Sequence, residues 1–205
     1  MLYSELQCSE AIRQAVERMG FAEMTEIQKK TIPVMLAGHD VIAKAPTGTG
    51  KTCAFGIPVA EHIQPENKYP QAVIMAPTRE LAQQIAEELT NLTYFMPEVQ
   101  VACVYGGANM EKQAKRLAEG CQIVVATPGR LMDHYKHHNI DLSHVTQIVL
   151  DEADEMLNMG FYKDVRHIIE MMKARKALSM FSATISREVM DIGWLYQHNA
   201  EEITV

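Results

Sequence analysis

Eight consecutive residues near the start of the chain have the types and spacing that hold a nucleotide phosphate. They are Ala45, Pro46, Thr47, Gly48, Thr49, Gly50, Lys51 and Thr52. Glycines let a backbone wrap around a phosphate, and the N–H groups of such a loop and of the following helix start bind anions. We expect Lys51 to reach the β- and γ-phosphates and the Thr52 hydroxyl to hold Mg²⁺. A glycine-rich turn is the alternative, but the apolar run before the loop and the helical pattern after it favour a phosphate site.

Acidic residues follow a second apolar run. Asp151, Glu152 and Asp154 come directly after residues 148–150, which are all apolar. A carboxylate that ends a strand beside the phosphate loop can reach the Mg²⁺ shell, partly through water, and Asp151 has this position. Glu152 is expected to take a proton from the attacking water. Acidic residues also favour the first turn of a helix, but the wholly apolar run before them favours a catalytic role.

Both sets need a fold that brings strand ends together, and the sequence predicts one. Short β-branched runs alternate with stretches whose apolar residues recur every three to four positions, which indicates a mostly parallel sheet of about seven strands with helices on both faces. The expected strands are residues 41–45, 72–76, 99–105, 122–126, 147–151, 177–182 and 202–205. The expected helices are residues 51–63, 79–92, 110–119, 162–173 and 187–196. Ligands of such sheets lie beyond the carboxyl ends of the strands, so the phosphate loop and the acidic run should meet there.

An N-terminal extension of 38 residues precedes the first expected strand. Its pattern predicts two helices that are separated near Gly20 and Phe21, with Thr25 as the N-cap of the second helix. A chain of 205 residues with 47% hydrophobic content suits one large α/β domain better than two small ones. We therefore expect residues 1–205 to form one domain that includes this extension.

The composition argues against several classes of protein. No apolar run approaches the roughly 20 residues of a membrane span, and no signal-peptide pattern is present, so we expect a soluble cytoplasmic protein without membrane contact. The cysteines form no Cys-x-x-Cys pair and are interpreted as core thiols in a reducing compartment. They are Cys8, Cys53, Cys103 and Cys121. The densest histidine group is His134, His137 and His138. A metal site is one interpretation, but a solvated helix end is favoured.

At residues 151–154 the chain reads Asp-Glu-Ala-Asp, and here it resembles the DEAD-box RNA helicases. Further motifs of the N-terminal half of that family follow one another over essentially the whole chain. Tyr3, Phe21 and Gln28 match the adenine-recognition motif. Motif Ia is matched at residues 77–82, the double-glycine element at 106–107, motif Ib at 127–130 and motif III at 182–184. The resemblance implies a RecA-like P-loop domain that binds ATP with Mg²⁺ and couples ATP hydrolysis to local RNA unwinding.

Adenine recognition is assigned by the resemblance to Gln28. Its amide can accept a hydrogen bond from the adenine N6 amino group and donate one to N7, a fit that guanine lacks. Phe21 is expected beside the base as an apolar or stacking neighbour. Tyr3 stands where the family usually has Phe, which keeps the ring, and Met24 stands where the family commonly has Pro.

The formal net charge of −7 argues against binding nucleic acid through bulk electrostatics, so any contact must come from a few placed groups. The resemblance implies such contacts to the RNA sugar-phosphate backbone, without reading of bases. The residues are Pro77, Thr78, Arg79, Gly107, Thr127, Pro128, Gly129 and Arg130. Arginine, threonine hydroxyls and exposed N–H groups at helix starts are suitable phosphate ligands. Taken singly, Arg79 and Arg130 also fit solvated or salt-bridged arginines.

The resemblance also implies a larger protein. Asp154, Ser182 and Thr184 would link the nucleotide site to movement between domains, although the last two residues also fit helix caps. The family has a second RecA-like domain that completes the ATP site, and nothing in this sequence matches its motifs. We expect this chain to be the N-terminal domain of a longer helicase similar to bacterial members, monomeric and nearly inactive by itself.

Two other function classes stay open. An ATPase that acts on something other than nucleic acid would share the phosphate loop and the acidic run, but it has no use for Gln28, Arg79 and Arg130. A non-catalytic nucleotide-binding module would not need the base Glu152. Contacts to a backbone do not distinguish RNA from DNA, so a DNA substrate also stays open.

Overall fold

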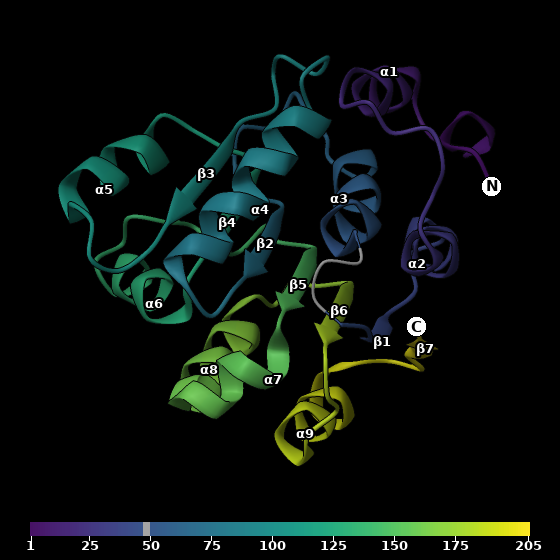
Figure 1. Cartoon of the computed structure of the whole chain (residues 1–205). Coiled ribbons are helices and arrows are strands. Elements are labelled where there is room, and N and C mark those ends of the chain that lie inside the picture. Colours follow the sequence, from purple (N-terminus) through teal and green to yellow (C-terminus); the bar gives the residue numbers. More distant parts are fainter. Residues whose placement is uncertain (47–49) are drawn as a thin grey trace.

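The computed structural model describes residues 1–46 and 50–205, and these residues build a seven-stranded sheet with strand order β3-β4-β2-β5-β6-β1-β7 (Figure 1). Every neighbouring pair in this sheet runs parallel, which confirms the predicted fold class. The strands are β1 (Val41–Lys44), β2 (Ala72–Met75), β3 (Val101–Val104), β4 (Ile123–Ala126), β5 (Gln147–Asp151), β6 (Ala177–Ser182) and β7 (Glu201–Thr204). β2, β4 and β5 are buried along their whole length, as their apolar sequences require of central strands.

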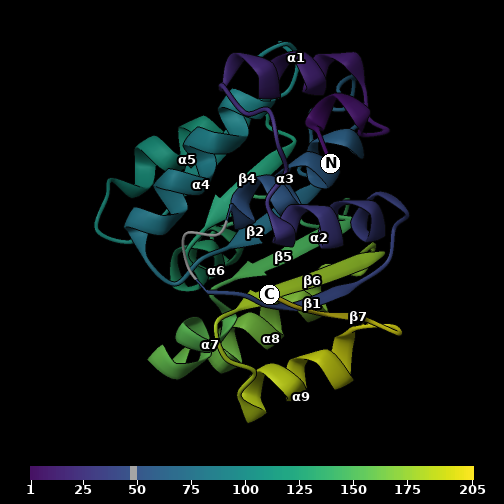
Figure 2. The same ribbon diagram turned by 45° about the vertical axis from the view of Figure 1, so that its right-hand side comes forward.

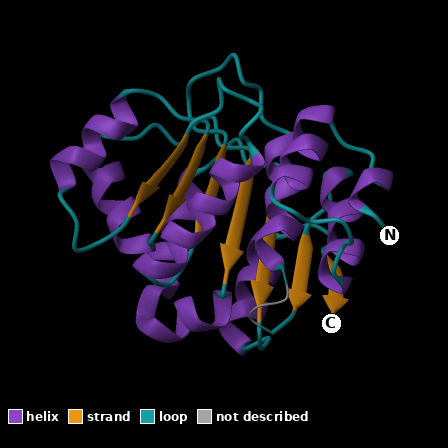
Figure 3. Cartoon of the chain, turned by 45° about the horizontal axis from the view of Figure 1, so that its top comes forward, coloured by secondary structure: helices purple, strands orange, loops and turns teal. Residues whose placement is uncertain are grey.

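Helices cover both faces of the sheet (Figures 2 and 3). They are α1 (Glu10–Arg18), α2 (Glu26–Leu36), α3 (Lys51–Glu61), α4 (Arg79–Leu92), α5 (Met110–Ala118), α6 (Pro128–Lys136), α7 (Ala153–Met156), α8 (Tyr162–Met171) and α9 (Arg187–Tyr196). Helices α1 to α4 contribute to one apolar core, and α5 to α9 contribute to the other. None of the helices in the described residues combines the length and the apolar character that a bilayer crossing requires.

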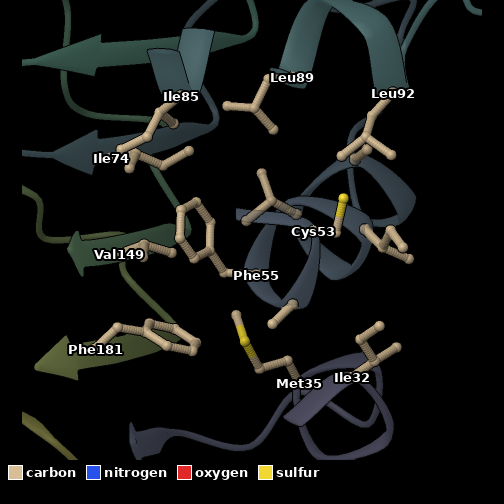
Figure 4. Packing of buried hydrophobic residues seen from close by; sticks show 14 of the residues in the cluster. Ile32, Met35, Cys53, Phe55, Ile74, Ile85, Leu89, Leu92, Val149 and Phe181 are labelled. Atoms are coloured by element: carbon tan, nitrogen blue, oxygen red, sulfur yellow. The ribbon is translucent and has the colours of Figure 1, made fainter. Parts of the chain in front are cut away.

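The two cores follow from the alternation of side chains along each strand. In β2, Ile74 belongs to the first core, whereas Val73 and Met75 belong to the second. In the first core, Phe55 of α3 lies against Phe181 of β6, with the ring centroids 5.3 Å apart (Figure 4). This packing seats α3 against the sheet and holds its first turn at the carboxyl end of β1.

The N-terminal segment folds back onto the start of α2. Leu2 and Glu23 form an antiparallel bridge, and the Tyr3 N–H donates to the carbonyl of Ala22 at 3.1 Å. Thr25 is the N-cap of α2 as predicted, and Gln28 completes a capping box by accepting from the Thr25 N–H at 3.0 Å. Tyr3 therefore lies beside Gln28, although 25 residues separate them.

The observed ends of all seven expected strands and five expected helices lie within two residues of the predicted ends. Helices α6 and α7 were not among the expected elements. Helix α6 begins at Pro128, inside a motif interpreted as a contact loop, because a proline in the first turn needs no partner for an N–H. Helix α7 has only four residues, too few to show a helical repeat in the sequence.

The interpretation of the histidine group is wrong for His134. This side chain is fully buried on α6, whereas His137 and His138 are exposed at the helix end. His134 Nε2 lies 3.0 Å from Gln113 Oε1, and its Nδ1 lies 3.1 Å from Asn139 Nδ2, so both ring nitrogens have partners. Burial lowers the pKa of His134, which keeps the ring neutral in this core position.

Candidate nucleotide site and nucleic-acid face

The phosphate-loop lysine and the acidic run meet at the carboxyl edge of the sheet. Lys51 begins α3 and Asp151 ends β5, and Lys51 Nζ lies 3.1 Å from Asp151 Oδ1. Glu152 Oε1 lies 4.0 Å from the same ammonium group. The Lys51 side chain is 8% exposed and that of Asp151 is 1% exposed, so the pair is buried. The predicted catalytic residues are thus brought together by the ends of non-adjacent strands.

Burial dominates the electrostatics of the two carboxyl groups. It raises the pKa of Asp151, while the Lys51 ammonium and the Glu152 N–H, which donates to Asp151 Oδ1 at 2.9 Å, act in the opposite direction. Burial also raises the pKa of Glu152, against the attraction of Lys51. The Glu152 backbone has φ 49°, in the left-handed region that is unfavourable for a side chain of this kind. A strained residue with a raised pKa beside a buried lysine is suited to accept a proton.

Glu88 on α4 is a carboxyl group near the nucleotide site that the sequence reasoning missed. Burial raises the pKa of Glu88, the nearby Thr52 side chain lowers it, and the charge of Asp151 raises it. The buried residues of α4 recur at Ile85, Leu89 and Leu92, which indicates that position 88 lies at the edge of the inward face. That spacing was the available signal, but it does not identify Thr52 as a neighbour of Glu88.

The residues present fit a magnesium ion held mainly by a nucleotide. Among the residues outside 47–49, no cluster of three or more His, Cys, Asp or Glu side chains has the geometry of a metal site. Mg²⁺ commonly uses one or two protein ligands with water and substrate phosphates, so the Thr52 hydroxyl and Asp151 suffice. Two carboxyl groups, of Asp151 and Glu152, lie beside the ammonium of Lys51, and a cation would balance their excess negative charge.

The phosphate loop itself is described only at its ends. Thr47, Gly48 and Thr49, predicted to bind phosphate, lie outside the described residues, and Pro46 is exposed. Gly50 has φ 81°, and a Cβ placed on it would lie 2.6 Å from Gln28 Nε2. Only glycine fits that conformation and that space.

The Gln28 amide is occupied within the protein. Its Oε1 accepts from the Tyr3 hydroxyl and the Thr25 N–H, and its Nε2 donates to the Gly50 carbonyl at 3.1 Å. Both acceptor positions are used and one N–H is left, so the two-bond contact with adenine stays a prediction that requires these bonds to rearrange. In this structure Gln28 ties the start of α2 to the phosphate loop.

The two aromatic residues of the adenine motif lie in different environments. Tyr3 is buried and contacts Gln28, whereas Phe21 is 44% exposed and lies against Tyr3 with ring centroids 6.3 Å apart. A hollow of about 460 Å³ opens beside Phe21. Its lining residues are Arg18, Met19, Phe21, Glu88 and Asn91. Of the two rings, Phe21 is the one that a base can reach.

The predicted coupling residues form one hydrogen-bonded group. Asp154 Oδ2 accepts from the Thr184 N–H at 3.1 Å and from the Thr184 hydroxyl at 2.7 Å. The Ser182 hydroxyl accepts from the Asp154 N–H at 3.0 Å and donates to the Thr184 carbonyl at 2.6 Å. The start of α7 and the turn after β6 are therefore joined next to Asp151 and Glu152.

The nucleic-acid residues divide into exposed and buried ones. Arg79 is exposed, its guanidinium lies 4.7 Å from the centroid of the Tyr105 ring, and it borders the exposed Gly107. Thr78 is half-buried, and its hydroxyl caps α4 by accepting from the Leu81 N–H at 3.2 Å. Arg79 and Gly107 are thus positioned at one surface, available to a phosphate.

Motif Ib and the first residue of motif Ia are turned more inward than the prediction implied. In motif Ib, Thr127 and Pro128 are buried and Gly129 is half-buried, and Pro77 of motif Ia is also buried. The Arg130 side chain is 14% exposed, and its Nη1 donates to the Ala108 carbonyl and to Gln113 Oε1, both at 3.0 Å. This geometry supports the alternative of a structurally bonded arginine for Arg130. Its contacts hold the double-glycine loop against α6.

Comparisons with known proteins agree with this architecture. A family model described as DEAD/DEAH box helicase matches residues 25–192. The ATP-dependent RNA helicase CshA of Limosilactobacillus reuteri is 46% identical over 205 residues, which are 100% of this chain and 41% of that protein. The CshA helicase of Listeria monocytogenes is 47% identical over 203 residues, which are 99% of this chain and 39% of the relative. The chain thus spans about two fifths of the length of these curated relatives.

Solved structures match the fold as well. The crystal structure of a DEAD box protein from Methanococcus jannaschii superimposes with a TM-score of 0.92 at 39% identity, over 100% of this chain and 56% of that one. A hypothetical ATP-dependent RNA helicase from Sulfolobus tokodaii gives a TM-score of 0.88 at 41% identity, over 96% and 57% of the two chains. The parallel sheet and its helices are therefore those of known DEAD-box proteins.

Proposed function

Because this chain belongs to the DEAD/DEAH box helicase family, we propose that it is the N-terminal RecA-like motor domain of an ATP-dependent RNA helicase. The observation that carries the proposal is the buried ion pair of Lys51 and Asp151, with Glu152 beside it and Asp154 bonded to Thr184. A module that only binds a nucleotide has no need of a carboxylate base, or of hydrogen bonds that join the acidic run to the turn after β6. The proposed ligand is ATP with Mg²⁺.

The residues of this chain have distinct proposed roles in ATP hydrolysis. Lys51 would bind the β- and γ-phosphates, and Asp151, together with the Thr52 hydroxyl, would hold Mg²⁺, partly through water. Mg²⁺, when bound, neutralises charge that develops on the phosphate oxygens. Glu152 orients the attacking water and accepts its proton, for which its raised pKa is favourable. The bonds of Asp154 to Thr184 carry any shift of the acidic run to the turn after β6.

RNA binding is proposed at the surface that carries Arg79 and Gly107, together with Thr78 and the N–H groups at the starts of α4 and α6. These groups favour phosphate oxygens and read no base, so binding would be independent of sequence. This limited set of contacts is compatible with a net charge of −7, because it needs no general positive potential. Local unwinding would follow when the two ends of the bound strand are held by different domains.

A second RecA-like domain of the same protein is the proposed partner. The relatives are more than twice as long as this chain, which leaves room for such a domain. Residues 1–205 would then be one domain, with residues 1–38 as its adenine-recognition extension. An arginine supplied by the partner domain would stabilise the charge of the transferring phosphoryl group.

ATP turnover of the full-length protein, measured with RNA, with DNA and with neither, tests this function. We expect turnover to rise with RNA. Equal turnover in all three conditions would instead indicate a P-loop ATPase that acts on another substrate. Stimulation of turnover by DNA alone would show that the nucleic-acid partner is DNA and not RNA. An RNA duplex with a single-stranded overhang then tests unwinding, which should require hydrolysable ATP.

A further inference from the structure

One aromatic side chain outside the matched motifs lies against Arg79 on the proposed RNA face. Tyr105 directly follows β3, which packs against α4 (Figure 1). The Arg79 guanidinium lies over the Tyr105 ring, 4.7 Å from its centroid, and the Tyr105 hydroxyl accepts a hydrogen bond from Gln83 Nε2 at 3.0 Å. Arg79 and Gln83 are four residues apart on α4, so their side chains are neighbours on one face of this helix. The Tyr105 ring therefore lies along that face, with Arg79 over the ring and Gln83 at the hydroxyl.

The backbone of Tyr105 is held from another side. Its carbonyl accepts from Gln113 Nε2 at 3.0 Å, and Gln113 Oε1 accepts from Arg130 Nη1, also at 3.0 Å. Tyr105 is thus joined to α5 and motif Ib through its carbonyl, and to α4 through its hydroxyl. These bonds give the ring a defined place beside the double-glycine element, and the guanidinium that stacks on the ring is placed with it.

The contact with Tyr105 leaves the charge of Arg79 available. In residues 1–46 and 50–205, no carboxylate forms an ion pair with Arg79. A cation–π contact restricts a guanidinium through the face of the ring, whereas the N–H donors lie in the guanidinium plane and stay free for a phosphate. By contrast, Arg130 Nη1 is hydrogen bonded to Ala108 and Gln113. Arg79 is therefore both oriented and chemically free.

We propose that Tyr105 is a positioning residue for RNA: its ring holds the Arg79 guanidinium in the orientation that binds a phosphate of the RNA backbone. This inference rests on the proposed function, which assigns Arg79 to RNA. An arginine loses side-chain freedom when it binds a ligand, and a ring that already restricts the guanidinium reduces that loss. Gly107 has φ 83°, and a Cβ placed on it would lie 3.9 Å from Arg79 Nη1, so a phosphate on Arg79 can also reach the exposed backbone of Gly107.

RNA-stimulated ATP turnover of the full-length protein, measured against the concentration of single-stranded polyuridine at saturating ATP, tests the proposal. We expect Tyr105→Leu to raise the half-stimulating RNA concentration about fivefold, which corresponds to a cation–π contact at an exposed site, and to leave kcat nearly unchanged. Tyr105→Phe keeps the ring and should stay within about twofold of wild type. Tyr94→Leu is the matched control, because exposed Tyr94 follows the other end of α4 and its ring centroid lies 3.6 Å from the Arg18 guanidinium.

A double-mutant cycle with Arg79→Ala separates positioning from other roles. Because Tyr105 acts through Arg79, Tyr105→Leu should add nothing to the loss that Arg79→Ala causes alone. Losses that multiply would mean that Tyr105 contacts RNA independently or only stabilises the fold, and they would refute the inference.

The remaining outcomes separate this inference from the function on which it rests. Tyr105→Leu with a wild-type RNA dependence, or Tyr105→Phe with the same loss as Tyr105→Leu, would refute the role of the ring while RNA stimulation stands. A wild-type RNA dependence of Arg79→Ala would remove Arg79 as a phosphate ligand, and the role of Tyr105 with it. A wild-type protein that RNA does not stimulate overturns both the proposed function and this inference.

Discussion

Glu152 combines two properties that are unfavourable for stability with a position beside a buried ammonium group. Its backbone is in the left-handed region, its pKa is raised by burial, and its carboxylate lies 4.0 Å from Lys51 Nζ. Left-handed backbone at a non-glycine residue costs on the order of 1–3 kcal/mol and tends to persist where function requires it. The structure thus supports Glu152, rather than Asp151, as the residue free to accept a proton, since Asp151 is fully engaged by Lys51 and the Glu152 N–H.

Glu152→Gln in the full-length protein should keep nucleotide binding and lower RNA-stimulated ATP turnover by about 10²- to 10⁴-fold, because the amide has the same shape but cannot accept a proton. Steady-state turnover and calorimetric ADP affinity give the two readouts. Glu17→Gln, which changes an exposed carboxylate on α1, serves as the control and should be near wild type. Turnover of Glu152→Gln within threefold of wild type would remove Glu152 as the base.

Gln28→Ala is expected to affect both the fold and the choice of base. The variant leaves the Tyr3 hydroxyl and the Thr25 N–H without their acceptor, and loss of a buried partner typically costs about 1–3 kcal/mol of unfolding free energy. Urea unfolding measures this loss, and calorimetry with ADP and GDP measures the preference for adenine. If the wild-type chain binds GDP as tightly as ADP, Gln28 has only the structural role.

At the scale of elements, the turn after β6 and the start of α7 are joined through Asp154. Burial acts to raise the pKa of Asp154, but the hydrogen bonds that its carboxylate accepts from the Thr184 hydroxyl and N–H help to outweigh it and hold the pKa below its ordinary value of 3.8. Because the folded pKa is lowered, the resulting stability is fully present above pH 3.8 and is lost as the pH falls through the lowered pKa.

Thr184→Ala should therefore reduce the unfolding free energy by about 1 kcal/mol at neutral pH, through loss of the hydroxyl bond to Asp154. The difference from wild type should shrink as the pH falls below 3.8, where the ionised form is lost from both proteins. Urea unfolding at several pH values checks this. Thr90→Ala is the control, because the Thr90 hydroxyl bonds a carbonyl of its own helix. A difference that stays constant with pH would contradict the linkage to Asp154.

The contact of α3 with α4 depends on one glycine. Gly56→Ala adds a carbon 2.8 Å from Leu92 Cδ1 in a fully buried interface, and overpacking costs about 1–3 kcal/mol, against about 1 kcal/mol gained in helix propensity. We expect a net loss of about 1 kcal/mol in urea unfolding. Gly193→Ala is the matched helical control, since its added carbon would approach other atoms no closer than 3.2 Å. A Gly56→Ala variant more stable than wild type would contradict the close packing.

At the scale of the whole molecule, the described residues place the nucleotide residues and Arg79 along one edge of the sheet. Two apolar cores hold that edge from opposite faces, and they leave the carboxyl ends of β1, β5 and β6 free for ligands. A second domain that completes this edge is part of the proposed function. Complete catalysis is therefore proposed to need both domains.

The chain alone should show negligible RNA-stimulated ATPase and no unwinding. An arginine from a partner domain can contribute about 10³- to 10⁵-fold to phosphoryl transfer, and half of the phosphate contacts to RNA would also be missing. The measurement compares this chain with the full-length protein at equal concentration and salt. A comparable RNA-stimulated rate for the chain alone would mean that the site is complete within these residues.

Local pattern was sufficient to predict the fold class and the centre of the site, but not the strand order. Strand and helix periods, with the rule that ligands lie at the carboxyl ends of parallel strands, predicted that Lys51 would meet Asp151 and Glu152. The contact follows from the strand order and needs no detail of helix packing. The N-cap at Thr25 could also be predicted from local sequence, because a capping box depends on only a few neighbouring residues.

Only the tertiary structure decided which side chains are already occupied. The amide of Gln28 bonds Tyr3, 25 positions away; Arg130 bonds Ala108 and Gln113; and His134 is buried against Gln113. These contacts depend on the register and rotation of one helix against another element, which the period of a single helix does not determine. The sequence by itself identified the chemical groups and the edge where they meet. The packing of distant helices decided which of those groups are free to act.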